Sequence, residues 1–398
     1  MAESIGLVLA GGGARGAYEV GVLRALLPWL EGEHGQRPDL FVGTSVGALN
    51  AAFLAANADK SAAELADEGR ERWLDIDYRR VLEPFLSPGE LVTATRLALS
   101  LVVREVVPLS LLDPAPLRRT LADMISFGDI RRNREQGALR VCAVVATAAH
   151  TNRSVVFHDG GPDPPSDDRR GIDYVATEIG EDHVLASAAI PVVFPAVHVR
   201  EPKPQAGWYF DGGTRLNTPI KPAVALGANR VIVIGLNSLT PATGTPRRAD
   251  LFDGASHVIQ GLLVDPVIND VETLAQTNQS PGPDRPVVPY IFIAPRTPNA
   301  VGKIARDTYG RSYSGLRGLL RSSDLSLLGR LIGAGRSSTR GELFSFLFFA
   351  REFTARLLRL GQEDGKRWIE ERHDDGAWQV GPLPQGSNAR RRTSRSAR

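Results

Sequence analysis

Three short glycine-rich motifs carry the residue types that acyl transfer requires. They are G-G-G-A-R-G at positions 11–16, G-T-S-V-G at 43–47 and D-G-G at 211–213. Together they offer backbone N–H donors for an oxyanion, a serine nucleophile and a carboxylate able to accept the serine proton. Each motif follows a short apolar segment typical of a buried strand. Their order and spacing predict a serine-dependent acyl-transfer site.

The first motif is predicted to form a strand-to-helix turn. An apolar run at 5–10 precedes it, and Val20, Leu23 and Leu27 follow at helical spacing. Glycines let a ligand approach backbone N–H groups closely, and a helix N-terminus favours negative charge. Arg15 either adds positive charge to the site or ties the loop down. The expected oxyanion hole comprises Gly11, Gly12, Gly13, Arg15 and Gly16.

Dinucleotide binding is the competing interpretation, because the same glycines fit the G-x-G-x-x-G pattern. That fold requires an acidic residue at the end of the second strand, where it would bond a ribose hydroxyl. The predicted second strand, 40–42, instead leads into Gly43 and Ser45, and the nearby acidic residues precede it. The pattern therefore favours an oxyanion over a dinucleotide.

Ser45 is the candidate nucleophile. Gly43 and Gly47 flank it where side chains would collide with a sharp strand-to-helix turn, an arrangement known as a nucleophile elbow. The small and apolar residues that follow predict a helix whose N-terminus would stabilise charge near the serine oxygen. The alternative is a glycine-flanked serine in an ordinary turn.

Asp211 is the candidate base, since none of the seven histidines lies in a recognisable motif. It ends a predicted strand at 208–210, and Gly212 and Gly213 allow its carboxylate to approach a neighbouring loop. Apolar neighbours such as Phe210 would raise the pKa of Asp211 and make it a better base. The alternative is a turn-forming Asp-Gly-Gly.

The three motifs, with Ala186-Ser187-Ala188-Ala189-Ile190-Pro191 and Phe194-Pro195 between the serine and the aspartate, resemble those of patatin-like phospholipases over about the first 235 residues. The resemblance implies a Ser45–Asp211 dyad without histidine, oxyanion donors at Gly12 and Gly13, and a three-layer α/β sandwich. It also implies cleavage of lipid acyl esters without a metal or other cofactor. Two alternatives stay open, an acyltransferase using the same dyad and a non-enzymatic membrane- or anion-binding protein.

The whole chain alternates predicted strands and helices, which is typical of an α/β fold with a mainly parallel central sheet flanked by helices. Further strands are predicted at 139–147, 230–236 and 287–294. We expect one catalytic domain at 1–385, with a motif-bearing core at 5–238. A helical insertion at 60–135 is expected either to form an acyl pocket or lid or simply to pack on the sheet. Added C-terminal helices are expected at 300–375.

One C-terminal helix is predicted from an apolar stripe that faces several charged residues. This stripe contains Leu343, Phe344, Leu347, Phe348, Leu357 and Leu358. Core packing is the favoured interpretation, and docking on a membrane is the alternative.

Composition fits a globular protein, with 42% hydrophobic and 23% charged residues in 398. The single Cys142 cannot form an internal disulfide, which suits a reducing compartment. Neither a leader-like start nor an apolar run of membrane-spanning length is evident. We therefore expect a cytoplasmic protein without bound metal or cofactor, acting on a lipid or acyl ester. The sequence does not specify an oligomeric state.

The C-terminal tail at 386–398 is predicted to be disordered. The formal net charge of the chain is +2, yet five arginines lie in the last nine residues, so the remainder is mildly acidic. The tail is either a solvated end or a segment that draws the protein to an anionic membrane surface. Nucleic-acid binding is not expected, because no aromatic residues are interleaved with the arginines.

Overall fold

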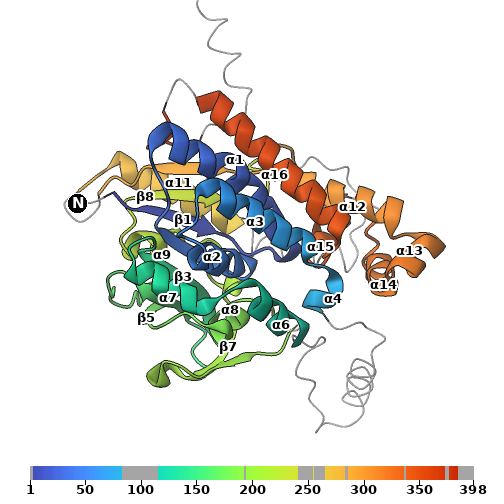
Figure 1. Ribbon diagram of the computed structural model, residues 1–398, viewed down its shortest axis with the longest axis horizontal. Helices are drawn as coiled ribbons and strands as arrows, with labels where there is room; N and C mark the ends of the chain where they lie inside the picture. The colour runs from blue at the N-terminus through green and yellow to red at the C-terminus, as the bar shows by residue number, and fades with distance from the viewer. Residues whose placement is uncertain are drawn as a thin grey trace, which may run out of the picture.

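The computed structural model describes residues 3–82, 115–191, 194–240, 254, 265–282, 286–335, 338–372 and 376–383. The predicted Arg-rich tail, and residues 83–114 of the predicted helical insertion, lie outside the described residues. Figure 1 shows how the elements are arranged around a central sheet.

The described part of the chain contains a nine-stranded sheet. Seven strands follow the order β5-β4-β3-β2-β1-β8-β9, and β7 pairs with both β3 and β6. The neighbouring strands β3, β2, β1, β8 and β9 all run parallel to one another. Strands β4 and β7 both run antiparallel to β3. The strands are β1 Ile5–Leu9, β2 Leu40–Thr44, β3 Val141–Ala148, β4 Ser154–Gly160, β5 Ile172–Ala176, β6 Val197–Val199, β7 Gly207–Asp211, β8 Arg230–Ile234 and β9 Tyr290–Ile293.

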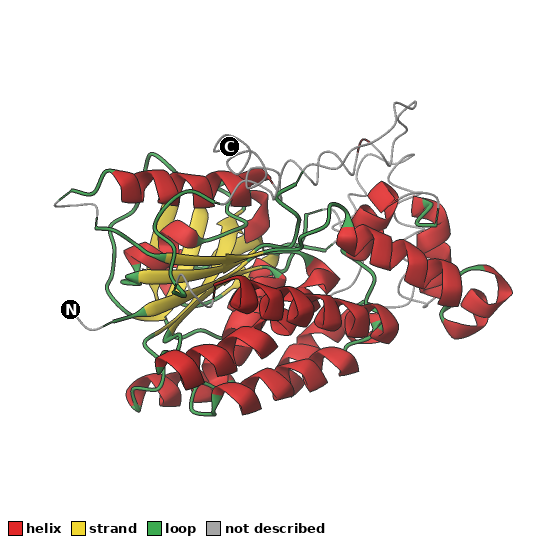
Figure 2. Cartoon of the chain, turned by 90° about the horizontal axis from the view of Figure 1, so that it is seen from above, coloured by secondary structure: helices red, strands yellow, loops and turns green. Residues whose placement is uncertain are grey.

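Helices cover both faces of this sheet, as the view from above shows (Figure 2). Three short 3₁₀ turns are also present, η1 Gly13–Arg15, η2 Lys203–Gln205 and η3 Gly212–Thr214. The described α-helices are α1 Gly16–His34, α2 Val46–Ala56, α3 Ala62–Asp75, α4 Tyr78–Val81, α6 Ala115–Met124, α7 Phe127–Glu135, α8 Glu181–Ser187, α9 Ile220–Ala225, α11 Asp265–Gln279, α12 Ala300–Ser312, α13 Gly315–Arg321, α14 Ser323–Ile332, α15 Ser338–Ser345 and α16 Arg351–Arg372.

The central strands bury side chains on both faces, which explains their continuous apolar runs. On β1, Leu7 and Leu9 join the large core beneath α1 and α2, whereas Val8 joins a second core with residues of α9 and α11. Strand side chains alternate between the two faces, so one apolar run serves both cores. The predicted fold class, a mainly parallel sheet flanked by helices with added C-terminal helices, is confirmed.

The sequence-based prediction was incomplete for the sheet and wrong for one C-terminal helix. The antiparallel strands β4 and β6 were not foreseen, because the apolar pattern of a short strand does not reveal the direction in which it pairs. The stripe beginning at Leu343 is not one helix. Helix α15 ends at Ser345 and α16 begins at Arg351, and the intervening Phe346–Ala350 turn lies against the glycine loop and the core.

Helix α16 packs on α1 through closely approaching backbones. A Cβ atom added at Gly361 would lie 2.2 Å from the carbonyl oxygen of Tyr18, and one added at Gly21 would lie 2.3 Å from the carbonyl oxygen of Leu358. The Tyr18 hydroxyl also donates to Asp364 Oδ2 at 3.1 Å. The C-terminal helix is therefore fixed onto the helix that follows the glycine loop.

We predict that Gly361→Ala destabilises the protein by about 1–3 kcal/mol, because the added methyl group overpacks a contact made by backbone atoms. Gly32→Ala is the matched control, since it lies in α1 with no atom within 4 Å of the new Cβ. This control should gain about 0.5–1 kcal/mol from helix propensity. Urea denaturation of both variants provides the measurement, and equal stabilities would contradict the proposed packing.

Candidate active site

Ser45 lies at the sharp turn between β2 and α2, with φ 56° and ψ −125°. This left-handed conformation is uncommon for a residue with a side chain. A Cβ added at Gly43 would lie 2.0 Å from the carbonyl oxygen of Gly47, and one added at Gly47 would lie 2.3 Å from the carbonyl oxygen of Leu9. The turn therefore closes only with glycine on either side of the serine.

Strand β3 brings Asp211 to this turn, because it pairs with β2 and then, further along, with β7. Thr44 at the end of β2 lies opposite Val145, and Asp211 at the end of β7 lies opposite the next residue, Ala146. The side chains of Ser45 and Asp211 consequently meet, and Ser45 Oγ donates a hydrogen bond of 2.6 Å to Asp211 Oδ2.

Asp211 is buried, and its carboxyl group has an unusual pKa. Its second oxygen, Oδ1, accepts a hydrogen bond of 2.7 Å from the Gly213 amide. Burial raises the pKa of Asp211 to about 6, although the hydrogen bonds from Ser45 and Gly213 oppose this shift. Of the histidines in the described residues, none hydrogen-bonds to Ser45 or Asp211.

The glycine loop of residues 11–16 has most of its amides already occupied. The Gly11 amide donates to Asn217, Ala14 to the Phe346 carbonyl, and Gly16 to the Gly13 carbonyl. Among the three consecutive glycines, the Gly12 and Gly13 amides donate no hydrogen bond to any of the described residues. Of the five residues expected to form the oxyanion hole, the loop thus leaves Gly12 and Gly13 available as donors.

The Arg15 side chain does not contact the dyad. It is buried against α15, where it forms an ion pair of 2.7 Å with Glu342 and donates from Nε to Ser345 Oγ at 2.7 Å. Its guanidinium also lies over the Phe346 ring, 3.8 Å from the centroid. Of the two roles considered for Arg15, these contacts support tying the loop down.

Ser187 is buried and contacts the turn that carries Ser45. The sequence analysis gave Ser187 no role. Its Oγ accepts from the Ser45 amide at 2.8 Å and donates to the Val145 carbonyl at 2.6 Å. The hydroxyl therefore joins α8, the serine turn and β3. Ser187 lies in the segment that resembles the family, but only the tertiary structure shows which atoms it bridges.

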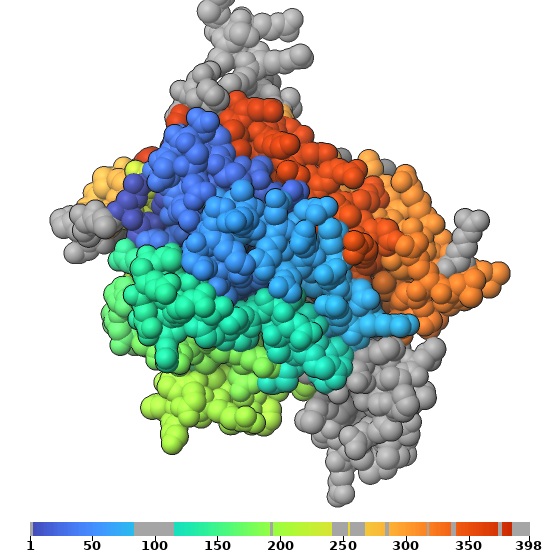
Figure 3. All heavy atoms as spheres, viewed as in Figure 1, coloured from blue at the N-terminus to red at the C-terminus, as the bar shows by residue number. Residues whose placement is uncertain are grey.

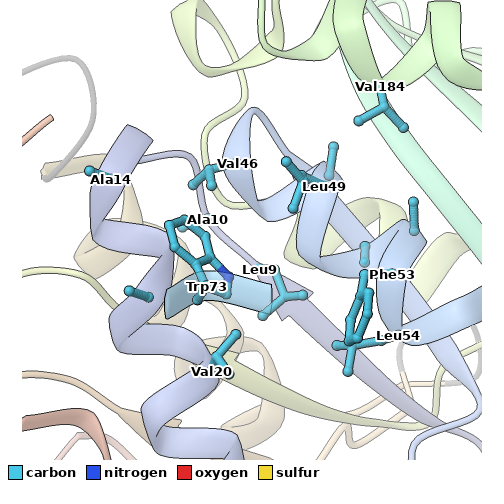
Figure 4. Packing of buried hydrophobic residues seen from close by; sticks show 14 of the residues in the cluster. Leu9, Ala10, Ala14, Val20, Val46, Leu49, Phe53, Leu54, Trp73 and Val184 are labelled. Carbon is cyan, nitrogen blue, oxygen red and sulfur yellow. The ribbon is translucent and has the colours of Figure 1, made fainter. Parts of the chain in front are cut away.

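A buried polar network supports the loop from beneath. Glu19 Oε1 accepts from the Ala10 amide at 2.9 Å, and Glu19 Oε2 accepts from Asn50 Nδ2 at 2.8 Å. The Trp73 indole donates to Asn50 Oδ1 at 2.9 Å. Burial raises the pKa of Glu19 to about 8. Figure 4 shows Trp73 among buried apolar side chains that include Val20 and Val46.

An apolar pocket that is partly open to solvent lies beside Ser45 and Gly13. Three of the four described helices of the insertion, α3, α4 and α6, contribute to its walls together with α2, α8 and the turn after α15. The apolar lining comprises Val46, Leu49, Trp73, Ile76, Val81, Leu82, Leu117, Leu121, Val184, Ala188, Ile190, Phe194, Phe346, Leu347 and Phe349. Such a lining favours an apolar group over a polar one.

The described residues contain no group of three or more His, Cys, Asp or Glu side chains placed to hold a metal ion. None of the helices in the same residues is both long and apolar enough to cross a membrane.

The sheet, the serine turn and the buried carboxylate define an α/β protein with a Ser–Asp pair at the carboxyl ends of its strands. The family model for patatin-like phospholipase matches residues 7–224, more than half of the chain. The chain belongs to the patatin-like phospholipase family.

Two curated relatives match over short segments. Lysophospholipase nte1 of Aspergillus terreus is 52% identical over 57 residues, and a patatin-like phospholipase domain-containing protein of Caenorhabditis elegans is 40% identical over 81 residues. These segments cover 14% and 20% of this chain, but only 3% and 6% of the two relatives.

Two solved structures are similar to this chain at low sequence identity and low TM-score. Human GIVD cytosolic phospholipase A2 is 14% identical with a TM-score of 0.44, over 93% of this chain and 59% of that one. VipD from Legionella pneumophila is 13% identical with a TM-score of 0.35, over 93% and 67%. The fold assignment itself rests on the sheet and helices described above.

We predict that Asp211→Asn stabilises the fold above pH 6. The folded-state pKa of about 6 exceeds the ordinary value of 3.8, so ionised Asp211 destabilises the native state at neutral pH and the protonated acid does not. The gain should be about 1–3 kcal/mol at pH 8 and should vanish as the pH falls toward 4. Thermal unfolding at both pH values provides the measurement. A gain that does not depend on pH would contradict the assigned cause.

Proposed function

We propose that this protein is a lipid acyl hydrolase, an esterase of the phospholipase A or lysophospholipase type, with Ser45 as nucleophile and Asp211 as base. The observation that carries this proposal is the 2.6 Å hydrogen bond between these two side chains, together with the apolar pocket that Ser45 lines. Family membership supports a lipid ester as the substrate class.

In the first step, Ser45 Oγ attacks the ester carbonyl carbon while its proton passes to Asp211 Oδ2. A carboxylate with a pKa of about 6 is a stronger base than one with the ordinary value, although proton transfer must still accompany attack. The carbonyl oxygen becomes an oxyanion, and the unoccupied Gly12 and Gly13 amides are its proposed donors. Each well-aimed donor would contribute roughly 3–4 kcal/mol.

Collapse of this intermediate breaks the ester bond. The proton held by Asp211 leaves with the alcohol, and the acyl group remains on Ser45. Water then attacks the acyl-enzyme, and Asp211 again accepts a proton. The bond between the acyl carbon and Ser45 Oγ breaks, Asp211 returns the proton to Oγ, and a fatty acid is released. The apolar pocket would hold the acyl chain during both steps, because burial of each CH₂ group contributes about 0.8 kcal/mol.

We expect Ser45→Ala and Asp211→Asn each to reduce ester hydrolysis by at least about a thousandfold, since each removes one partner of the proton transfer. Fluorophosphonate labelling of Ser45 should be lost in the first variant and strongly slowed in the second. Released products from a lipid panel, identified by mass spectrometry, give the activity. Gly32→Ala serves as the control with native activity.

Three results would count against this assignment. Native turnover by either dyad variant would exclude the dyad. No labelling of the wild-type protein would favour an anion-binding role without catalysis. A new ester formed in the presence of acceptor alcohols, in place of free fatty acid, would identify an acyltransferase that uses the same two residues.

The pH profile provides a separate prediction. Asp211 must be ionised to accept the serine proton, and its pKa is raised to about 6. The rate of acyl-enzyme formation should therefore be constant above about pH 7 and fall tenfold per pH unit well below 6. Stopped-flow hydrolysis of a soluble activated ester measures this rate. A plateau that persists down to pH 4 would argue against Asp211 as the base.

A further inference from the structure

Two short helices near the C-terminal end of the fold carry strongly exposed leucines. Leu316 and Leu320 of α13 are 80% and 90% exposed, and Leu331 and Leu327 of α14 are 68% and 41% exposed. Each pair is spaced four residues apart, so its members lie on one face of their helix. We call these four residues the leucine patch. Clustered apolar side chains of this kind commonly mark an interaction surface.

The exposure of the leucine patch does not come from poorly packed helices. The opposite side of α14 is well buried through Leu325, Leu328 and Ile332. Ser322 Oγ caps the start of α14 by accepting from the Leu325 amide at 3.3 Å, and Gly333 ends the helix with φ 70°. A well-formed helix thus presents apolar residues both to the core and to solvent.

The segment that carries the leucine patch has a net positive charge. Residues 311–335 contain four arginines and a single acidic residue, Asp324, which is buried. The side chains of Arg311 and Arg330 are exposed, while Arg321 pairs with Glu352 and lies over the Tyr313 ring. Exposed leucines bordered by arginines match a lipid surface with negatively charged headgroups.

The segment that carries the leucine patch contacts the turn whose residues line the pocket. The Tyr313 ring, just before α13, meets the Phe348 ring edge-on at 5.2 Å, and the neighbours of Phe348, Leu347 and Phe349, line the pocket. In the view of Figure 1, α13 and α14 lie at the right-hand side of the molecule, on the side where α4, which contributes Val81 to the pocket wall, is also seen. The space-filling view shows the 315–332 region projecting from this side (Figure 3).

We propose that the leucine patch is the surface by which this protein docks on an anionic lipid bilayer. The leucines enter the headgroup and acyl boundary, and the surrounding arginines contact lipid phosphates. The proposed function identifies the bilayer as the source of substrate, but the binding itself does not require catalysis. Docking here places the pocket wall near the membrane surface.

The test uses the full-length chain with Ser45→Ala as the background, so that the vesicles are not hydrolysed. Binding is measured by co-sedimentation with phosphatidylcholine vesicles, with and without phosphatidylglycerol. The double variant Leu316→Ser and Leu320→Ser should lose at least about tenfold in partition coefficient on the mixed vesicles. Arg311→Gln with Arg330→Gln should weaken binding only to vesicles that contain phosphatidylglycerol.

Trp208→Ser is the matched control, because Trp208 is 57% exposed on β7, outside the leucine patch. It should bind vesicles as the background protein does. Unchanged binding of the double leucine variant, or an equal loss with Trp208→Ser, would overturn the proposal. So would a change in oligomeric state of the leucine variant by light scattering, since a second copy would then be the partner.

Hydrolysis of a soluble short-chain ester separates this proposal from the proposed function. With Ser45 restored, the leucine variant should hydrolyse the soluble ester at the wild-type rate and vesicle phospholipid at least about tenfold more slowly, in line with its lost binding. If vesicle binding depends on the leucines but the wild-type protein hydrolyses neither substrate, the docking surface is supported and the proposed function is contradicted. If the leucine variant hydrolyses both substrates at the wild-type rate, the docking surface is contradicted and the proposed function is supported.

Discussion

The pairing of β2 and β7 along one longer strand, β3, is the constraint on which the candidate site depends. β2 ends opposite Val145 and β7 ends opposite Ala146, so Ser45 and Asp211 meet although 166 positions separate them. A register shift of one residue would turn Asp211 to the other face of the sheet. Sheet hydrogen bonding therefore positions the dyad, which needs no flexible loop to bring it together.

Around this pair the protein tolerates buried carboxyl groups that weaken its stability. Both Asp211 and Glu19 are buried with raised pKa values of about 6 and 8, and the hydrogen bonds to each come from neutral donors. Each carboxyl group holds backbone at the site, Asp211 through Gly213 and Glu19 through Ala10. Placing polar groups at fixed positions around reacting atoms is how a rigid site stabilises developing charge.

The motifs predicted the glycine turn, because its geometry is local. They also predicted the meeting of Ser45 and Asp211, because each residue follows or ends a predicted strand and the family resemblance pairs them. The roles of Asn217, Ser187 and Phe346 could not be predicted, since no motif marks their contacts with segments far apart in the chain. Strand direction at β4 and the break after Ser345 were missed for a related reason. Apolar periodicity reports burial but not the partner against which a segment is buried.

The turn after α15 has a wider implication. Its Phe346 carbonyl binds the Ala14 amide, and its Phe346, Leu347 and Phe349 line the pocket, yet it lies beyond the segment matched by the family model. The segment that the family model matches is therefore shorter than the part of the chain that forms the candidate site. Under the proposed function, substitutions of Leu347 and Phe349 in this turn would alter the shape of the pocket beside Ser45 without replacing Ser45, Asp211 or any residue of the glycine loop.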